Sequence, residues 1–93
     1  MNEVLDAIKT FGKDSQCKMA IEEMSELTKE ICKNFRGSQN IDAIAEEIAD
    51  VKIMLMQLEL IFDCSDKVIK WQNNKLRRLK NILEKESEKE NDS

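Results

Sequence analysis

The acidic residues of this sequence are spaced so that several carboxylates could act together at one site. Two acidic runs stand out, residues 22–26 (Glu-Glu-Met-Ser-Glu) and residues 46–50 (Glu-Glu-Ile-Ala-Asp). On a helix, residues three or four positions apart lie on the same face, so each run would project its carboxylates together. If two such helices pack antiparallel, the two acidic faces can meet at one level. Four carboxylates would then converge: Glu23, Glu26, Glu47 and Asp50.

Such a cluster repels itself and needs positive charge nearby. Residues 22–50 hold eight acidic residues, against the three basic residues Lys29, Lys33 and Arg36. The sequence has no histidine, and ligands that are all oxygen suit magnesium or manganese better than zinc or copper. We therefore predict a site for Mg²⁺, with Mn²⁺ as a substitute.

An ordinary solvated helix surface is the alternative interpretation of these runs. Glutamate is a good helix former, and the first run taken alone fits that alternative. The second run differs, because the stripe that starts at Glu47 and Asp50 continues at helical spacing through Met54, Gln57 and Ile61. Ionised groups on a mostly apolar stripe need a partner. The metal prediction therefore depends chiefly on the second run.

The elements that would position the acidic runs are helices. The 93 residues contain no proline and two glycines, Gly12 and Gly37, which favours long helices over strands joined by tight turns. Apolar residues spaced three and four apart predict helices over residues 2–11, from about 14 to 35, from 41 to about 63, and from 65 onward. The expected N-caps are Asp14 or Ser15, then Asn40 and Ser65. The predicted fold is all-α, a four-helix bundle-like chain.

The second, third and fourth helices have apolar seams, the last formed by Ile69, Leu76, Leu79 and Leu83. The seam of the second helix consists of Cys17, Ala20, Met24, Leu27 and Ile31. The seam of the third consists of Ile44, Ile48, Val51, Leu55, Leu58 and Phe62. The third helix also has further apolar residues beside its seam, and a helix that is apolar nearly all round belongs in the middle of an assembly. So short a chain predicts that a homodimer or homotetramer supplies part of the cover.

The end of the chain changes character. Residues 67–80 contain six basic residues and no acidic one, whereas residues 84–93 contain no apolar residue. We predict one all-α domain over residues 1–83 and a charged tail over residues 84–93 that frays after a turn or two of helix.

Composition excludes several other classes of protein. A net charge of −4 argues against a nucleic-acid binder. Three cysteines with no CxxC pair argue against a disulfide framework or a zinc site. The longest apolar run, residues 51–62, is too short to span a bilayer and contains two charged residues. No signal-peptide pattern opens the sequence. We expect a soluble cytoplasmic protein without a membrane partner.

The paired acidic runs resemble the motifs of MazG-like nucleotide pyrophosphohydrolases, in the all-α NTP pyrophosphatase superfamily. The likeness lies in Glu22-Glu23-x-x-Glu26, a spacer of about twenty residues, and Glu47-x-x-Asp50. Residues 11–13, Gln16 and residues 19–27 are similar to the segment around the family's first motif, and residues 48–51 to the second. The resemblance covers roughly residues 8–80 and fits the short, single-domain phage or bacterial type.

The resemblance implies hydrolysis of a nucleoside triphosphate, NTP or dNTP, between its α- and β-phosphates, giving a monophosphate and pyrophosphate. It implies four metal ligands, Glu23, Glu26, Glu47 and Asp50. Either flanking acid, Glu22 or Glu46, would orient or deprotonate the attacking water. The residues expected to contact the substrate are Lys75, Arg78, Asn74, Trp71 and Gln16. For the basic residues of the last helix the alternative is a solvated surface, and for Trp71 it is packing.

Two other functional classes compete with this one. A non-catalytic helical interaction or regulatory module would show the same apolar seams and charged tail. A di-iron carboxylate bundle usually needs Glu-x-x-His, and the absence of histidine sets it aside.

Overall fold

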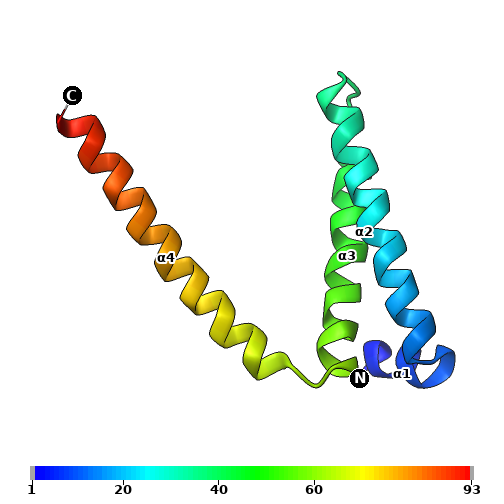
Figure 1. Cartoon of the computed structure of the whole chain (residues 1–93). Helices are drawn as coiled ribbons and strands as arrows, with labels where there is room; N and C mark the ends of the chain where they lie inside the picture. Colours follow the sequence, from blue (N-terminus) through cyan, green and yellow to red (C-terminus); the bar gives the residue numbers. More distant parts are fainter. Residues whose placement is uncertain (1, 93) are drawn as a thin grey trace. The chain divides into compact units, whose positions relative to one another are not determined.

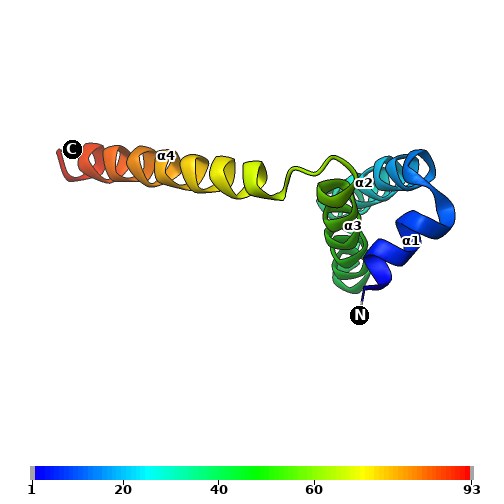
Figure 2. The same cartoon turned by 90° about the horizontal axis from the view of Figure 1, so that it is seen from below.

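The computed structural model describes residues 2–92 and confirms the all-α class (Figure 1, Figure 2). Four helices follow one another, and the described residues contain no strand. The helices are α1 (Glu3–Phe11), α2 (Lys13–Phe35), α3 (Ile41–Ile61) and α4 (Ser65–Asp92). The chain divides between Asp63 and Cys64 into two compact units. No helix in the described range has the length and apolar character needed to cross a bilayer.

The first two helices meet at Gly12. Helix α1 starts behind Asn2, whose side chain accepts a hydrogen bond from the backbone N–H of Leu5 at 3.1 Å. Gly12 has a φ of 93°, which glycine adopts without strain, so α2 begins at the next residue. The predicted caps Asp14 and Ser15 are therefore wrong, because both already lie inside the first turn of α2. There the carboxylate of Asp14 faces the positive end of the helix dipole.

Helices α2 and α3 form an antiparallel hairpin (Figure 1). Helix α2 ends where Gly37 takes a φ of 102° and the backbone N–H of Ser38 donates back to the carbonyl of Lys33 at 3.1 Å. This pattern satisfies carbonyls that a helix end leaves open. Helix α1 packs on both partners near the opposite end of the hairpin (Figure 2). Its Ile8 is buried.

Asn40 occupies the N-cap position of α3, as predicted, but its side chain does not cap the helix. Its amide nitrogen donates to the backbone carbonyl of Glu30 at 2.9 Å and to the Glu30 carboxylate at 3.0 Å. Its oxygen accepts from the amide of Asn34 at 3.3 Å. A hydrogen bond to a carboxylate is roughly twice as strong as one between neutral groups, which favours this arrangement over capping. Asn40 thus fastens α3 to α2.

Replacing Asn40 with alanine should lower the melting temperature by about 4–8 °C at pH 7. Hydrogen bonds from Asn40 and Lys33 lower the pKa of Glu30 from its ordinary value of 4.5. A lowered pKa in the folded state means that the stabilisation is present above the unfolded pKa and is lost as the pH falls through the folded one. The difference between wild type and Asn40→Ala should therefore shrink below about pH 4.5.

Thermal melts between pH 7 and pH 3 measure this difference. Asn73→Ala, at an exposed amide of α4, is the matched control and should melt like the wild type. A difference between wild type and Asn40→Ala that stays constant with pH would contradict the assigned contact.

The faces that meet in the hairpin are only partly the predicted seams. The buried or half-buried face of α2 contains Gln16, Ala20, Glu23, Leu27 and Glu30. That of α3 contains Ala43, Glu47, Asp50, Met54, Gln57 and Ile61, the stripe on which the metal prediction depends. Several seam residues stay exposed within the chain, including Met24 (39%), Ile31 (41%), Ile48 (40%), Leu55 (45%) and Phe62 (65%). The predicted seams are therefore confirmed in part: Ala20 is buried and Leu27, Ile44, Val51 and Leu58 are half-buried, but polar residues also pair across the hairpin.

The second unit is the single helix α4. It begins at Ser65 itself, so the predicted cap Ser65 is already helical. An apolar edge follows the helix and is exposed, with Ile69, Leu76, Leu79 and Leu83 among its members. The charged residues 84–92 continue the helix to Asp92.

Candidate metal centre

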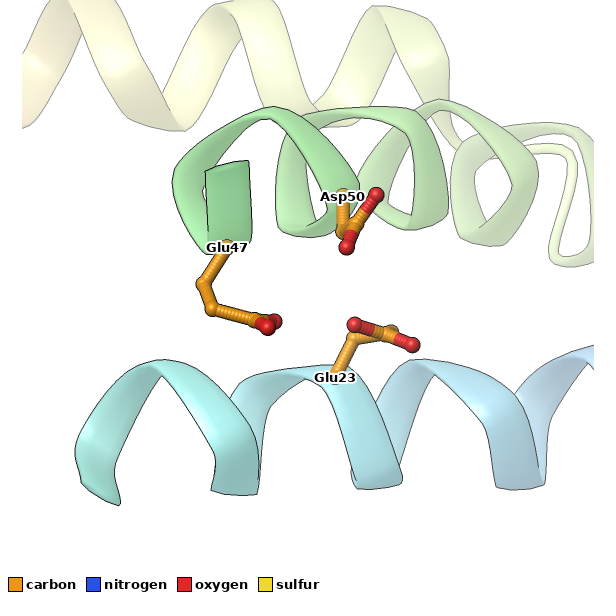
Figure 3. Close-up of side chains that lie close together, drawn as sticks. All are labelled: Glu23, Glu47 and Asp50. Atoms are coloured by element: carbon orange, nitrogen blue, oxygen red, sulfur yellow. The ribbon is translucent and has the colours of Figure 1, made fainter. Parts of the chain in front are cut away.

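Three acids from the two antiparallel helices meet between them. Glu23 points from α2 toward α3, and Glu47 and Asp50 point back from α3 (Figure 3). One carboxylate oxygen of each residue lies within 4.8 Å of one oxygen of both others, and all three residues are half-buried. Glu47 and Asp50 are three residues apart and therefore share one face of α3. The antiparallel hairpin brings the two acidic runs to one level, as their spacing predicts.

The cluster is the middle one of three polar levels. Glu23 lies seven residues from both Gln16 and Glu30 on α2, which is two helical turns in either direction. At one outer level, Gln16 Nε2 donates to Gln57 Oε1 at 2.6 Å. At the other, Asn40 donates to Glu30. The outer levels thus pair an amide donor with an oxygen acceptor, whereas the middle level contains carboxyl groups alone.

Nothing among the described residues neutralises the middle level. Ion pairs join Lys29 to Glu26, Lys33 to Glu30 and Lys89 to Glu86, and none of these three reaches the cluster. The Oε2 atom of Glu47 is buried and has no hydrogen-bond partner in the described part of the chain. A buried acceptor without a donor costs about 1–3 kcal/mol, and more when charged.

The cluster changes the acidity of Glu23. Burial raises the pKa of this carboxyl above its ordinary 4.5, and hydrogen bonding to Glu47 and the charges of Asp50 and Glu47 raise it further. Each of these causes disfavours the ionised form. A proton at low pH or a cation at neutral pH would therefore relieve the repulsion within the cluster.

The donor set fits a hard divalent cation. Carboxylate oxygen is the ligand that Mg²⁺ and Mn²⁺ prefer, and the orphaned Glu47 oxygen is a donor that such an ion would satisfy. Magnesium typically takes one or two carboxylates and keeps other positions for water and substrate phosphate. Glu23, Glu47 and Asp50 would hold it here.

Comparison with known proteins identifies no relative of this chain. No protein-family model, no curated protein and no solved structure matches the chain.

The fourth predicted ligand lies outside this cluster. Glu26 is exposed on α2 and pairs with Lys29 at 3.6 Å, in a contact where both side chains are at least half exposed. Glu22 and Glu46, the predicted water-activating acids, are also exposed and adjoin the predicted ligands Glu23 and Glu47 in sequence. The roles of these three acids remain predictions from the resemblance.

The predicted substrate contacts on α4 lie in the second unit. The Lys75 ammonium lies 6.0 Å from the centroid of the Trp71 ring, at the limit of a cation–π contact. Both residues lie on one side of the helix, together with apolar residues such as Val68 and Leu76. Asn74 and Arg78 are exposed on the same helix.

Gln16 occupies a different environment from the one expected of a substrate contact. It is 2% exposed and Gln57, its partner, is 4% exposed. The sequence did not predict the pairing of Gln16 with Gln57 or of Glu30 with Asn40. A signal was present, because Gln16 and Glu30 flank Glu23 at seven-residue spacing and Gln57 lies on the stripe of Glu47 and Asp50.

Proposed function

We propose that this protein is a magnesium-dependent nucleoside triphosphate pyrophosphohydrolase of the MazG-like type. Water would cleave an NTP or dNTP between the α- and β-phosphates, giving the nucleoside monophosphate and pyrophosphate. The observation that carries the proposal is the polar level of Glu23, Glu47 and Asp50, which contains carboxylates alone between two levels that are amide-paired.

Some acids of the hairpin would bind the cation, and others would accept a proton from water. Glu23, Glu47 and Asp50 would hold the cation, and Glu26 would join them from the next turn of α2. The exposed ion pair of Glu26 with Lys29 contributes little to stability, so exchanging it costs little. Divalent cations bound at such a site neutralise phosphate charge and lower the pKa of water, which makes a carboxylate a sufficient base. Glu22 or Glu46 would accept the proton of the attacking water.

Residues of α4 would bind the substrate. Lys75 and Arg78 would pair with the phosphates that leave as pyrophosphate, and Asn74 would donate a hydrogen bond to them. Trp71 offers an exposed aromatic face on which a base can stack. Phosphoryl transfer depends mostly on positioning and charge neutralisation, which these side chain types supply.

Self-association would complete the fold as a helical bundle. Ile48, Leu55 and Phe62 expose their side chains on one side of α3, and α4 has an apolar edge of its own. Exposed apolar surface of this kind marks an interaction site, and covering it stabilises by about 25 cal/mol for each Å². We propose a homodimer or homotetramer.

A panel of NTPs and dNTPs tests the activity. The full chain is incubated with each nucleotide and magnesium, and pyrophosphate and monophosphate are measured. We expect both products in equal amounts from at least one nucleotide, and none when a chelator removes the metal. If no nucleotide releases pyrophosphate, or if Glu47→Ala is as active as the wild type, the proposal is wrong.

A non-catalytic helical interaction module is the second candidate. The exposed apolar residues of α3 and α4 favour it, because they would equally serve a partner protein. Melting with and without magnesium separates the two candidates. A catalytic site predicts stabilisation by magnesium that disappears with Glu26→Ala or Asp50→Ala, whereas a module should be indifferent to the metal or slightly stabilised by these substitutions.

A further inference from the structure

We infer that the two outer polar levels, Gln16–Gln57 and Glu30–Asn40, are positioning residues: they select which faces of α2 and α3 meet and so gather the three acids. The metal-binding part of this inference rests on the proposed function, whereas the choice of helix faces does not. None of the four side chains needs to touch substrate or metal.

A competing packing of the same hairpin exists in the sequence. Each acid of the cluster has an apolar neighbour one position further along the helix: Met24 follows Glu23, Ile48 follows Glu47 and Val51 follows Asp50. Turning both helices by one position, about 100°, would bring these apolar residues inward and the acids outward. Met24 and Ile48 are 39% and 40% exposed and Val51 is half-buried, so the turned packing would bury more of these three side chains. Met54, now 5% exposed, would move outward, and Leu55, now 45% exposed, would take its place. Repulsion between the acids favours the turned packing.

The outer levels favour the observed packing. Gln16 and Gln57 are almost fully buried and joined at 2.6 Å, and the Asn40 amide contacts Glu30 at 3.0 Å. Rotating either helix by about 100° would separate the members of both pairs. Because Glu23 lies two helical turns from both Gln16 and Glu30, fixing the helix faces at the two outer levels also fixes the face at the middle one. A buried polar pair can select one packing in this way at a cost in stability.

The glutamine pair is the more decisive of the two. The loop of residues 36–40 already holds the hairpin together beside Glu30 and Asn40, whereas Gln16 and Gln57 lie at the far end. Their contact also carries a cost, since the Oε1 atom of Gln16 is buried without a hydrogen-bond partner among the described residues. Two leucines would fill similar space without that cost, so stability alone does not account for two amides here.

Replacing both glutamines tests the inference by separating stability from metal binding. Gln16→Leu/Gln57→Leu in the full chain should melt at the same or a higher temperature without metal, because an apolar pair replaces a polar pair with one unsatisfied oxygen. Its affinity for Mn²⁺, measured from the electron paramagnetic resonance signal of the free ion, should fall at least about tenfold. If the glutamine pair were merely structural, the double leucine variant would keep both the melting temperature and the Mn²⁺ affinity of the wild type. Gln72→Leu on α4 is the matched control and should leave both unchanged.

A distance measurement keeps this inference apart from the proposed function. Spin labels at Lys18→Cys and Lys52→Cys, both exposed, report the relative rotation of α2 and α3 after the native cysteines are replaced by alanine. A 100° turn of a helix about 10–12 Å across moves a surface side chain on the order of 8 Å. We expect a single distance in the labelled parent and a second, shifted population in the double leucine variant. An unchanged distance overturns the inference, even if the wild type binds Mn²⁺. If the wild type binds no Mn²⁺, the proposed function fails, and a shifted distance still supports the positioning role.

Discussion

Replacing Asp50 with asparagine is expected to lower magnesium-dependent pyrophosphate release at least about a hundredfold. Removing a group that merely orients a metal ligand typically lowers metal affinity or activity by about 10–100-fold. Removing a direct ligand should therefore lower activity by at least the upper value. Asp50 lies opposite Glu23 and beside Glu47, where the change removes one negative charge and one oxygen donor from a half-buried cluster. Steady-state rates at saturating magnesium, together with Mn²⁺ affinity, measure the effect.

Asp42→Asn is the matched control for this substitution. It makes the same chemical change on the same helix, at an exposed residue in the first turn of α3, and should leave the rate within about twofold. Glu22→Gln separates the roles of the acids, because a residue that accepts a proton can lose activity while metal affinity stays near that of the wild type. Metal affinity that falls as much in Glu22→Gln as in Asp50→Asn would show that the ligands have been assigned to the wrong residues.

Replacing Glu23 with glutamine is expected to stabilise the metal-free protein and to weaken the response to magnesium. The raised pKa of Glu23 means that the folded protein binds this proton more tightly than the unfolded chain does. The contribution of Glu23 to stability is then fully present below the unfolded pKa, near 4.5, and is lost as the pH rises through the folded pKa. Glutamine stays neutral throughout, so its advantage should be small near pH 4 and larger at pH 7–8.

Magnesium should reverse the order of stability. A ligand at a hundred times its dissociation constant stabilises by about 2.7 kcal/mol, which corresponds to a rise in melting temperature on the order of 10 °C for a chain of this size. The wild type should show that rise, and Glu23→Gln much less of it. Glu84→Gln, an exposed acid on α4, should behave like the wild type at every condition. A Glu23→Gln protein that melts below the wild type without metal at pH 8 would argue against a repulsive cluster.

The sequence by itself determined the helices and the level at which the acids meet. The absence of proline, the position of Gly37 and the three–four spacing of apolar residues fix the hairpin of α2 and α3 within a few residues. In an antiparallel hairpin with so short a loop, position along each helix follows from counting residues away from the turn. Counted from the turn, the runs at residues 22–26 and 46–50 lie within about one helical turn of each other, and the structure brings Glu23 to Glu47 and Asp50.

The tertiary structure decided which face of each helix points inward. Apolar residues occur on two neighbouring faces of α3, so their periodicity is compatible with either choice. The choice depends on pairs such as Gln16 with Gln57, whose members are 41 positions apart in the chain and therefore leave no local pattern. The same reason explains why Asn40 contacts Glu30 rather than capping α3, and why Glu26 lies outside the cluster that Glu23 joins. Hydrogen bonds across an interface are decided pair by pair, whereas sequence periodicity describes one helix at a time.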